Sequence, residues 1–177
     1  VNITDGNITS HNYGIDNEYG NINITGGKIE SDNANGMYVR SGTTNISGGN
    51  IISKLDSGVY NSMYGRNLTI EGGTIKGKNG NTNYGMLTIG KKDGVVDSKK
   101  PTIIGTEYGL QINITSSTIS DVKYYDGEIY GETAAIYGSV NELENEKEIQ
   151  ITQETLDENQ YQVSRLVEET INENGIA

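Results

Sequence analysis

An eight-residue phrase recurs along the chain and constrains its fold more than any other feature. It alternates apolar and polar residues, passes through Gly-Gly and ends on isoleucine; the clearest copies lie at 22–29, 44–51 and 68–75. Alternation is typical of a half-buried strand, and glycine permits the positive φ of a sharp bend before the next strand. Weaker copies lie at 1–8, 112–119 and 122–129.

A second phrase, usually a glycine and an aliphatic residue, follows each copy by about half a period. It reads Gly14-Ile15, Gly36-Met37, Gly58-Val59, Gly85-Met86, Gly109-Leu110 and, less well, Ala135-Ile136. Self-similarity at a period of about 20 to 50 residues indicates a solenoid. These repeats are too short, too β-rich and too rich in glycine for helical repeats. The sequence therefore predicts an all-β parallel β-helix of about six coils.

Stacked coils should place equivalent aliphatic residues in buried columns along the axis. The first predicted column is Ile24, Ile46, Ile70 and Ile89. The second is Ile29, Ile51 and Ile75. The third is Met37, Val59, Met86 and Leu110. The polar stretch 76–83 is expected to form a loop between the second and third columns of the fourth coil.

Irregularities gather in the last coils. A lysine-bearing insert is expected at 90–100, and Pro101 should lie in that insert or at a strand start, because proline cannot donate to a ladder. Only one of the phrases 112–119 and 122–129 can be the strand of the sixth coil. The phrase at 122–129 is favoured because it lies at the usual distance from Ala135-Ile136. The other would be an extra strand or a protruding hairpin.

After Gly138 the composition changes, with glycine absent until Gly175. Alternation at 148–152 and 160–164 predicts an antiparallel hairpin that closes the last coil, since an open coil offers unpaired backbone. An amphipathic helix built on Val163, Leu166, Val167 and Ile171 remains the alternative. The expected organisation is repeats at 1–140, a capping hairpin at 141–167 and a linker or tail at 168–177. Further coils are expected before residue 1, because the chain opens inside a strand phrase.

Composition narrows the classes of partner. Only 33% of the residues are hydrophobic, which a narrow solenoid core tolerates better than a globule does. The net charge of −11 disfavours nucleic acid and anionic membranes as partners. No stretch approaches the roughly 20 apolar residues of a membrane span. The absence of cysteine excludes disulfides and thiolate metal sites, and we predict no metal or other cofactor.

The phrase Ile-Thr-Gly-Gly-x-Ile followed by Gly-aliphatic-Tyr resembles the repeats of large cell-surface, adhesin-like proteins of Gram-positive bacteria. Leu87-Thr88-Ile89-Gly90, Tyr125-Asp126-Gly127-Glu128-Ile129 and Ile136-Tyr137-Gly138 look like the terminal coils of such arrays. The resemblance covers about 1–140. It implies a pectate-lyase-like right-handed parallel β-helix in a secreted protein, located at the cell surface or cell wall.

Catalysis has little support in the sequence. Polygalacturonase-like β-helices resemble one another in Asp-Asp, Gly-His-Gly and Arg-Ile-Lys motifs, and this chain has none of them. His11, the single histidine, is expected to be an exposed loop residue. Asp5, Asp93 and Asp126 take the turn position of a repeat glycine, so a turn-forming role is expected rather than a catalytic pair. The chain is predicted not to be an enzyme.

Tyrosine is the only aromatic residue, with 12 copies. If Met37 and Val59 point inward, Tyr38 and Tyr60 should point outward from equivalent positions, and Tyr137 should share their column. Such a row either shields the ladder from water or stacks on sugar rings. The function hypothesis is a non-catalytic structural or adhesive module, a spacer or display rod with a glycan or host-surface protein as partner. The alternative is a glycan-binding or glycan-cleaving β-helix, a polysaccharide lyase or hydrolase.

Overall fold

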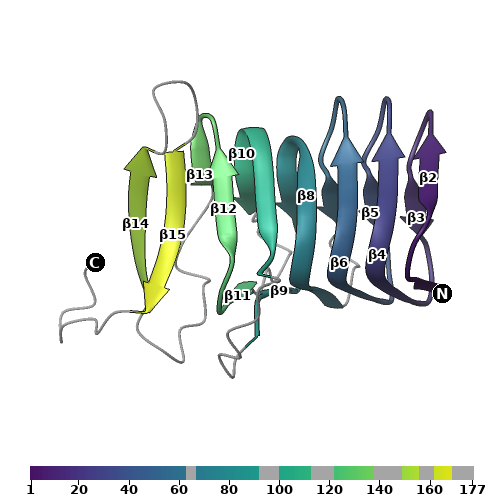
Figure 1. Cartoon of the computed structure of the whole chain (residues 1–177), viewed down its shortest axis with the longest axis horizontal. Helices are drawn as coiled ribbons and strands as arrows, with labels where there is room; N and C mark the ends of the chain where they lie inside the picture. The colour runs from purple at the N-terminus through teal and green to yellow at the C-terminus, as the bar shows by residue number, and fades with distance from the viewer. Residues whose placement is uncertain (63–66, 92–99, 113–121, 138–148, 156–161, 169–177) are drawn as a thin grey trace.

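The computed structural model describes residues 1–62, 67–91, 100–112 and 122–137, together with the backbone of 149–155 and 162–168. Its described regular structure is entirely β. Strands from successive repeats lie side by side along one long axis (Figure 1), as a parallel β-solenoid of about five turns. The predicted fold class is confirmed, whereas the predicted count of six coils is not.

The strands fall into long rungs and short ones. The long rungs are β4 (Asn21–Ser31), β6 (Thr43–Ser53), β8 (Asn67–Asn83) and β10 (Thr102–Ile112). The short strands of the first four repeats are β1 (Asn2–Ile3), β2 (Asn7–Ser10), β3 (Ile15–Asn17), β5 (Met37–Val39), β7 (Val59–Asn61) and β9 (Leu87–Ile89). Later strands are β11 (Val122–Tyr124), β12 (Glu128–Gly131), β13 (Ala134–Tyr137), β14 (Ile149–Thr155) and β15 (Gln162–Glu168).

The first buried column has the predicted members. Ile24 pairs with Ile46, Ile46 with Ile70, and Ile70 with Ile89 in the parallel ladders that join β4, β6, β8 and β9. None of these four side chains is more than 1% exposed. The equivalence read from the repeated phrase is therefore a physical stacking of identical side chains along the axis.

The second column is also confirmed and is longer than predicted. Ile29, Ile51 and Ile75 pair in sequence, and the register continues through Ile103 to Ile129. None of these five side chains is more than 1% exposed. Isoleucine suits this position because its β-branched side chain packs well on a pleated surface.

The third column corrects the prediction. Met37 pairs with Val59, but Val59 pairs with Asn81, and Asn81 pairs with Leu110. Met86 does not belong to this column and is 41% exposed. The stretch 76–83 is not a loop, because β8 continues through it to Asn83. The pair Gly80-Asn81 therefore takes the place of Gly58-Val59, and a polar amide occupies an aliphatic position.

The Gly-Gly bends are built into the rungs rather than placed between separate strands. β4, β6 and β8 each run through their glycines, with register shifts at those points. Gly49 has φ of 85°, and a Cβ there would lie 2.8 Å from the Gly26 carbonyl oxygen of the coil before. Both the left-handed backbone and the close approach of adjacent coils therefore require glycine.

The competition between the two late phrases is settled by pairing. β11 pairs with β9 and β12 pairs with β10, both in parallel, so the phrase at 122–129 is the coil strand, as predicted. Ile112 ends β10, and the rest of the phrase at 112–119 lies outside the described residues. Pro101 directly precedes β10, as expected for a proline, and its carbonyl accepts from the Glu128 amide at 2.8 Å.

The C-terminal segment is strand where it is described. β14 pairs antiparallel with β15, and β15 pairs antiparallel with β12 at the end of the solenoid (Figure 1). Residues 162–168 are therefore strand, in agreement with the hairpin and not with the alternative helix. A protective capping role for this hairpin and the limits drawn at 141–167 and 168–177 remain predictions.

Candidate functional site

The predicted tyrosines lie in one register on the outside of the solenoid. Tyr38 pairs directly with Tyr60 across β5 and β7. The same row continues through Thr82 and Gln111 to Tyr137 at the end of β13. The inward neighbours Met37 and Val59 are fully buried, so the expected alternation holds at these positions.

The rings of four tyrosines, Tyr13, Tyr38, Tyr60 and Tyr84, stack along the axis and are called the tyrosine ladder below. Tyr38 and Tyr60 have ring centroids 5.0 Å apart at an interplanar angle of 22°. Tyr13 lies against Tyr38 at 5.3 Å, and Tyr84 lies against Tyr60 at 5.6 Å. Tyr137 is not in this stack, because its ring packs on Tyr108 at 4.5 Å. Tyr13 and Tyr84 were not predicted to join this row, although each precedes the glycine of a repeat phrase.

Stacking covers the ring faces that a sugar would need. Tyr38 has a ring on each side, and so does Tyr60. Their edges and hydroxyl groups are what the ladder offers to a ligand. Burial, with smaller contributions from Tyr84, raises the pKa of Tyr60 well above its ordinary range.

Arg40 covers the ladder beside Tyr38. Its guanidinium carbon lies 4.4 Å from the Tyr38 ring centroid and 5.9 Å from that of Tyr13, within the range of cation–π contacts. The same group donates two hydrogen bonds to Asp16, at 2.8 and 3.0 Å. Asp16 therefore neutralises the positive charge of Arg40 through a bidentate contact, and Arg40 is not available to bind an anion.

An open groove of about 700 Å³ follows the ladder. Residues from four successive repeats line it: Glu18, Tyr19, Tyr38, Arg40, Ser41, Tyr60, Ser62 and Tyr84. Tyr19 is 81% exposed, and it is not in contact with another ring among the described residues. This groove is the candidate functional site, since it combines aromatic surface, hydroxyl groups and a compensated charge.

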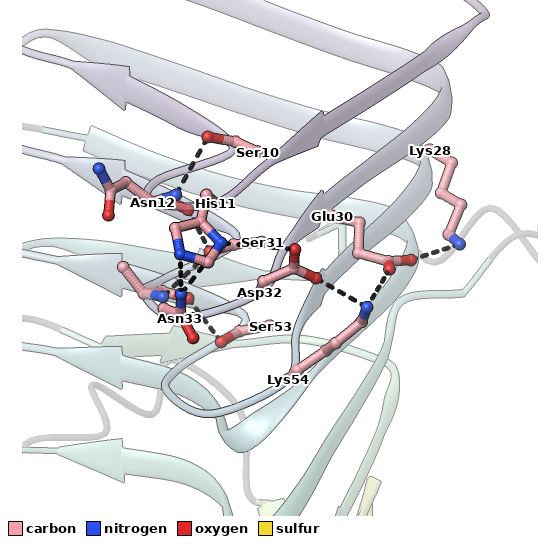
Figure 2. A network of polar contacts seen from close by, with 11 residues as sticks. Ser10, His11, Asn12, Lys28, Glu30, Ser31, Asp32, Asn33, Ser53 and Lys54 are labelled. Atoms are coloured by element: carbon pink, nitrogen blue, oxygen red, sulfur yellow. Dashed lines mark hydrogen bonds and ion pairs between the residues drawn. The ribbon is translucent and has the colours of Figure 1, made fainter.

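A second polar cluster joins three repeats on another part of the surface (Figure 2). Lys54 forms ion pairs with Glu30 at 3.1 Å and with Asp32 at 2.7 Å, and Lys28 also pairs with Glu30. Hydrogen bonds from Lys28 and then Lys54 lower the pKa of Glu30, and the hydrogen bond from Lys54 lowers that of Asp32. Lys54 pairs with residues of the preceding coil, which is typical of a cross-strand stabilising network, whereas Lys28 and Glu30 lie on the same strand.

His11 belongs to this cluster and is exposed, as predicted. Its side chain is 82% exposed, and its Nδ1 lies 3.9 Å from an Asp32 oxygen. The amide nitrogen of Asn33 lies 2.9 Å from the other ring nitrogen (Figure 2). No serine or cysteine nucleophile is paired with this ring among the hydrogen bonds of the described residues, so the cluster offers no triad.

The candidate turn aspartates behave as turn residues where they are described. Asp5 accepts a hydrogen bond from the Gly6 amide at 2.7 Å, and Asp126 accepts one from the Gly127 amide at 2.8 Å. Asp126 is also ion-paired with Lys100 at 2.9 Å. Asp93 lies outside the described residues, so its pairing with Asp126 stays an untested hypothesis.

Within the described ranges, no three His, Cys, Asp or Glu side chains are grouped as metal ligands. The same ranges contain no helix that is long and apolar enough to span a membrane. No family model matches the chain, and neither the curated proteins nor the solved structures include a significant match. Its class, a parallel β-solenoid, therefore rests on its own register and burial.

Proposed function

We propose that the chain is a non-catalytic structural and adhesive module, a stiff rod that spaces or displays other parts of a secreted bacterial surface protein. The observation that carries the proposal is the continuity of the buried columns, with isoleucine following isoleucine from Ile24 to Ile89 and from Ile29 to Ile129. Each inner coil is paired on both sides, so bending one coil would break ladders with two neighbours.

Two further features support a rod over an enzyme. The described hydrophobic core consists largely of aliphatic side chains, and the groove is open to the surface. The described candidate carboxylates, Asp5 and Asp126, are used by their own turns. The proposal includes an extracellular location and attachment to a glycan or a host-surface protein. An adhesive rod has to lie outside the cell to contact such partners.

Stiffness can be measured between two introduced labels. The chain has no cysteine, so Thr9→Cys in β2 together with Glu132→Cys in the bend between β12 and β13 places one spin label on an exposed residue near each end of the described solenoid. We expect a narrow distribution of label distances by pulsed electron resonance. A broad distribution in a protein that still shows a β-type circular dichroism spectrum would overturn the rod.

The absence of catalysis is tested by incubation with neutral and acidic polysaccharides. We expect no sustained release of new reducing ends or unsaturated sugars. Turnover that is lost on changing Asp126→Asn or Asp93→Asn would replace the proposal by the glycan-cleaving alternative. Location is tested by protease treatment of intact producing cells, which should remove the protein if it is on the surface.

A further inference from the structure

Tyr108 and Tyr137 are the closest pair of aromatic rings in the described part of the chain. Their ring centroids lie 4.5 Å apart, at an interplanar angle of 17°. Tyr108 belongs to β10 and Tyr137 to β13, and these two strands pair in parallel in adjacent coils. The backbone of the fold therefore holds the two phenol rings against each other, although they lie far apart in the sequence.

The composition directs one-electron oxidation of this chain to tyrosine. Cysteine and tryptophan, which compete with tyrosine for such oxidants, are both absent. Met86 is 41% exposed, but oxidation of its thioether adds an oxygen atom and links no residues. The phenol rings are therefore the side chains on which a one-electron oxidant acts, and the product depends on which rings are neighbours.

Tyr137 combines access to solvent with a close neighbour. It is 51% exposed, so an external oxidant can reach its ring. Tyr19 is more exposed, at 81%, but it contacts no other ring among the described residues. In the tyrosine ladder, Tyr13 lies 5.3 Å from Tyr38 at a wider interplanar angle of 31°. Tyr108 and Tyr137 are therefore the pair best placed for a radical on one ring to meet the other.

We propose that Tyr108 and Tyr137 form a dityrosine cross-link, which staples the last described coil to the coil before it. The co-reactants are a haem peroxidase and hydrogen peroxide. Each phenol loses one electron and one proton, and the two radicals couple through the ring carbons next to their hydroxyl-bearing carbons. The hydrogen atoms on the two coupled carbons then move to the phenol oxygens. The protein has lost two hydrogen atoms, and the peroxide has been reduced to two molecules of water.

The cross-link would strengthen the pairing of a short strand. β13 is four residues long and pairs with β10 through Ala134, Ile136 and Tyr137. A covalent bond between Tyr108 and Tyr137 closes a loop in the unfolded chain and lowers its entropy, as a disulfide does in chains that contain cysteine. This inference goes beyond the rod proposal and does not depend on it.

The test is treatment of dilute protein with a haem peroxidase and hydrogen peroxide, followed by isolation of the monomer by gel filtration. We expect dityrosine fluorescence, an intact mass lower by two hydrogen atoms, and one linked peptide pair that contains Tyr108 and Tyr137 after proteolysis. The linked monomer should melt about 5 °C above the untreated protein, because the bond constrains the unfolded chain. Free tyrosine in a parallel reaction confirms that the oxidant is active.

Phenylalanine variants separate a specific cross-link from general oxidation. Tyr137→Phe keeps the ring and its stacking but removes the phenol, so the monomer should lose its dityrosine fluorescence, and Tyr108→Phe should behave in the same way. Tyr19→Phe is the matched control, because it removes a more exposed phenol that contacts no ring among the described residues. Its monomer should fluoresce as the wild type does.

Four results would overturn the inference: no dityrosine in the monomer, cross-links that join only separate molecules, a linked pair other than Tyr108 and Tyr137, or unchanged monomer fluorescence in Tyr137→Phe. A linked monomer that melts no higher than the untreated protein would show that the bond is not a staple.

Discussion

Asn81 is a polar residue at an apolar position, and replacing it should stabilise the solenoid. It is fully buried in the third column, between Val59 and Leu110. Its amide nitrogen donates to the Val59 carbonyl at 3.2 Å, but its side-chain oxygen has no partner among the described residues. Leucine is similar in shape to asparagine and matches the next residue of the column, so Asn81→Leu is the change to make.

The magnitude follows from four opposed contributions. Removing an unpaired buried oxygen gains about 1 to 3 kcal/mol, and loss of the one hydrogen bond costs about 0.5 to 1.5 kcal/mol. Burial of a leucine side chain contributes about 1.5 to 3 kcal/mol. The added volume costs about 1 to 3 kcal/mol. The sum of the mid-range values favours Asn81→Leu by about 1 kcal/mol, which raises the melting temperature by about 2 to 4 °C in a chain of this size.

The assay is thermal and urea unfolding followed by circular dichroism in the β region. The reciprocal variant Val59→Asn is the matched control, because it buries an amide at the neighbouring position of the same column and should destabilise by about 2 kcal/mol or more. A lower melting temperature for Asn81→Leu would refute the reasoning. It would mean that the amide oxygen is satisfied, as a bound internal water would do.

Three further changes test the fold. Ile46→Asp buries a charge without a partner at a cost of several kcal/mol, so no soluble folded protein is expected on expression. Gly49→Ala should lower the melting temperature more than Gly6→Ala: both have positive φ, but only Gly49 would place a Cβ 2.8 Å from a carbonyl oxygen. Lys54 lowers the pKa of Asp32, so the ionised Asp32 stabilises the fold at pH values above its unfolded pKa, and this stabilisation is lost as the pH falls through its folded pKa. The free energy of unfolding, measured by urea titration from pH 6 to 2, should therefore fall less in Lys54→Met than in the wild type. Equal pH dependence in both proteins would contradict that assignment.

The first two columns could be predicted because their information is local. Alternation with period two decides which side of a strand is apolar, and repetition of the phrase decides which isoleucines are equivalent. Ile24 and Ile46 follow from these rules without knowledge of any neighbour. The bend at Gly-Gly also follows from the sequence, because the positive φ of Gly49 favours glycine over other residues.

The third column was predicted correctly at Met37, Val59 and Leu110, but the member between Val59 and Leu110 was not. A stretch of Gly, Asn and Lys at 76–83 has the composition of a loop, and Gly85-Met86 imitates the repeat phrase better than Gly80-Asn81 does. Which pair enters the core depends on the ladder with β7, and that ladder pairs Val59 with Asn81. Backbone pairing with the adjacent coil overrode the hydrophobic pattern at this position.

The candidate site also has features that follow from the sequence and features that only the tertiary structure sets. The sequence by itself determined that Tyr38 and Tyr60 share an outward row, because strand alternation and repeat period are properties of the chain. Only the tertiary structure decided that Tyr13 and Tyr84 complete the stack, that Arg40 is held by Asp16, and that Tyr19 lies in the groove and is 81% exposed. Ring directions and grooves arise between coils about 4.8 Å apart, where side chains from distant positions compete for the same space.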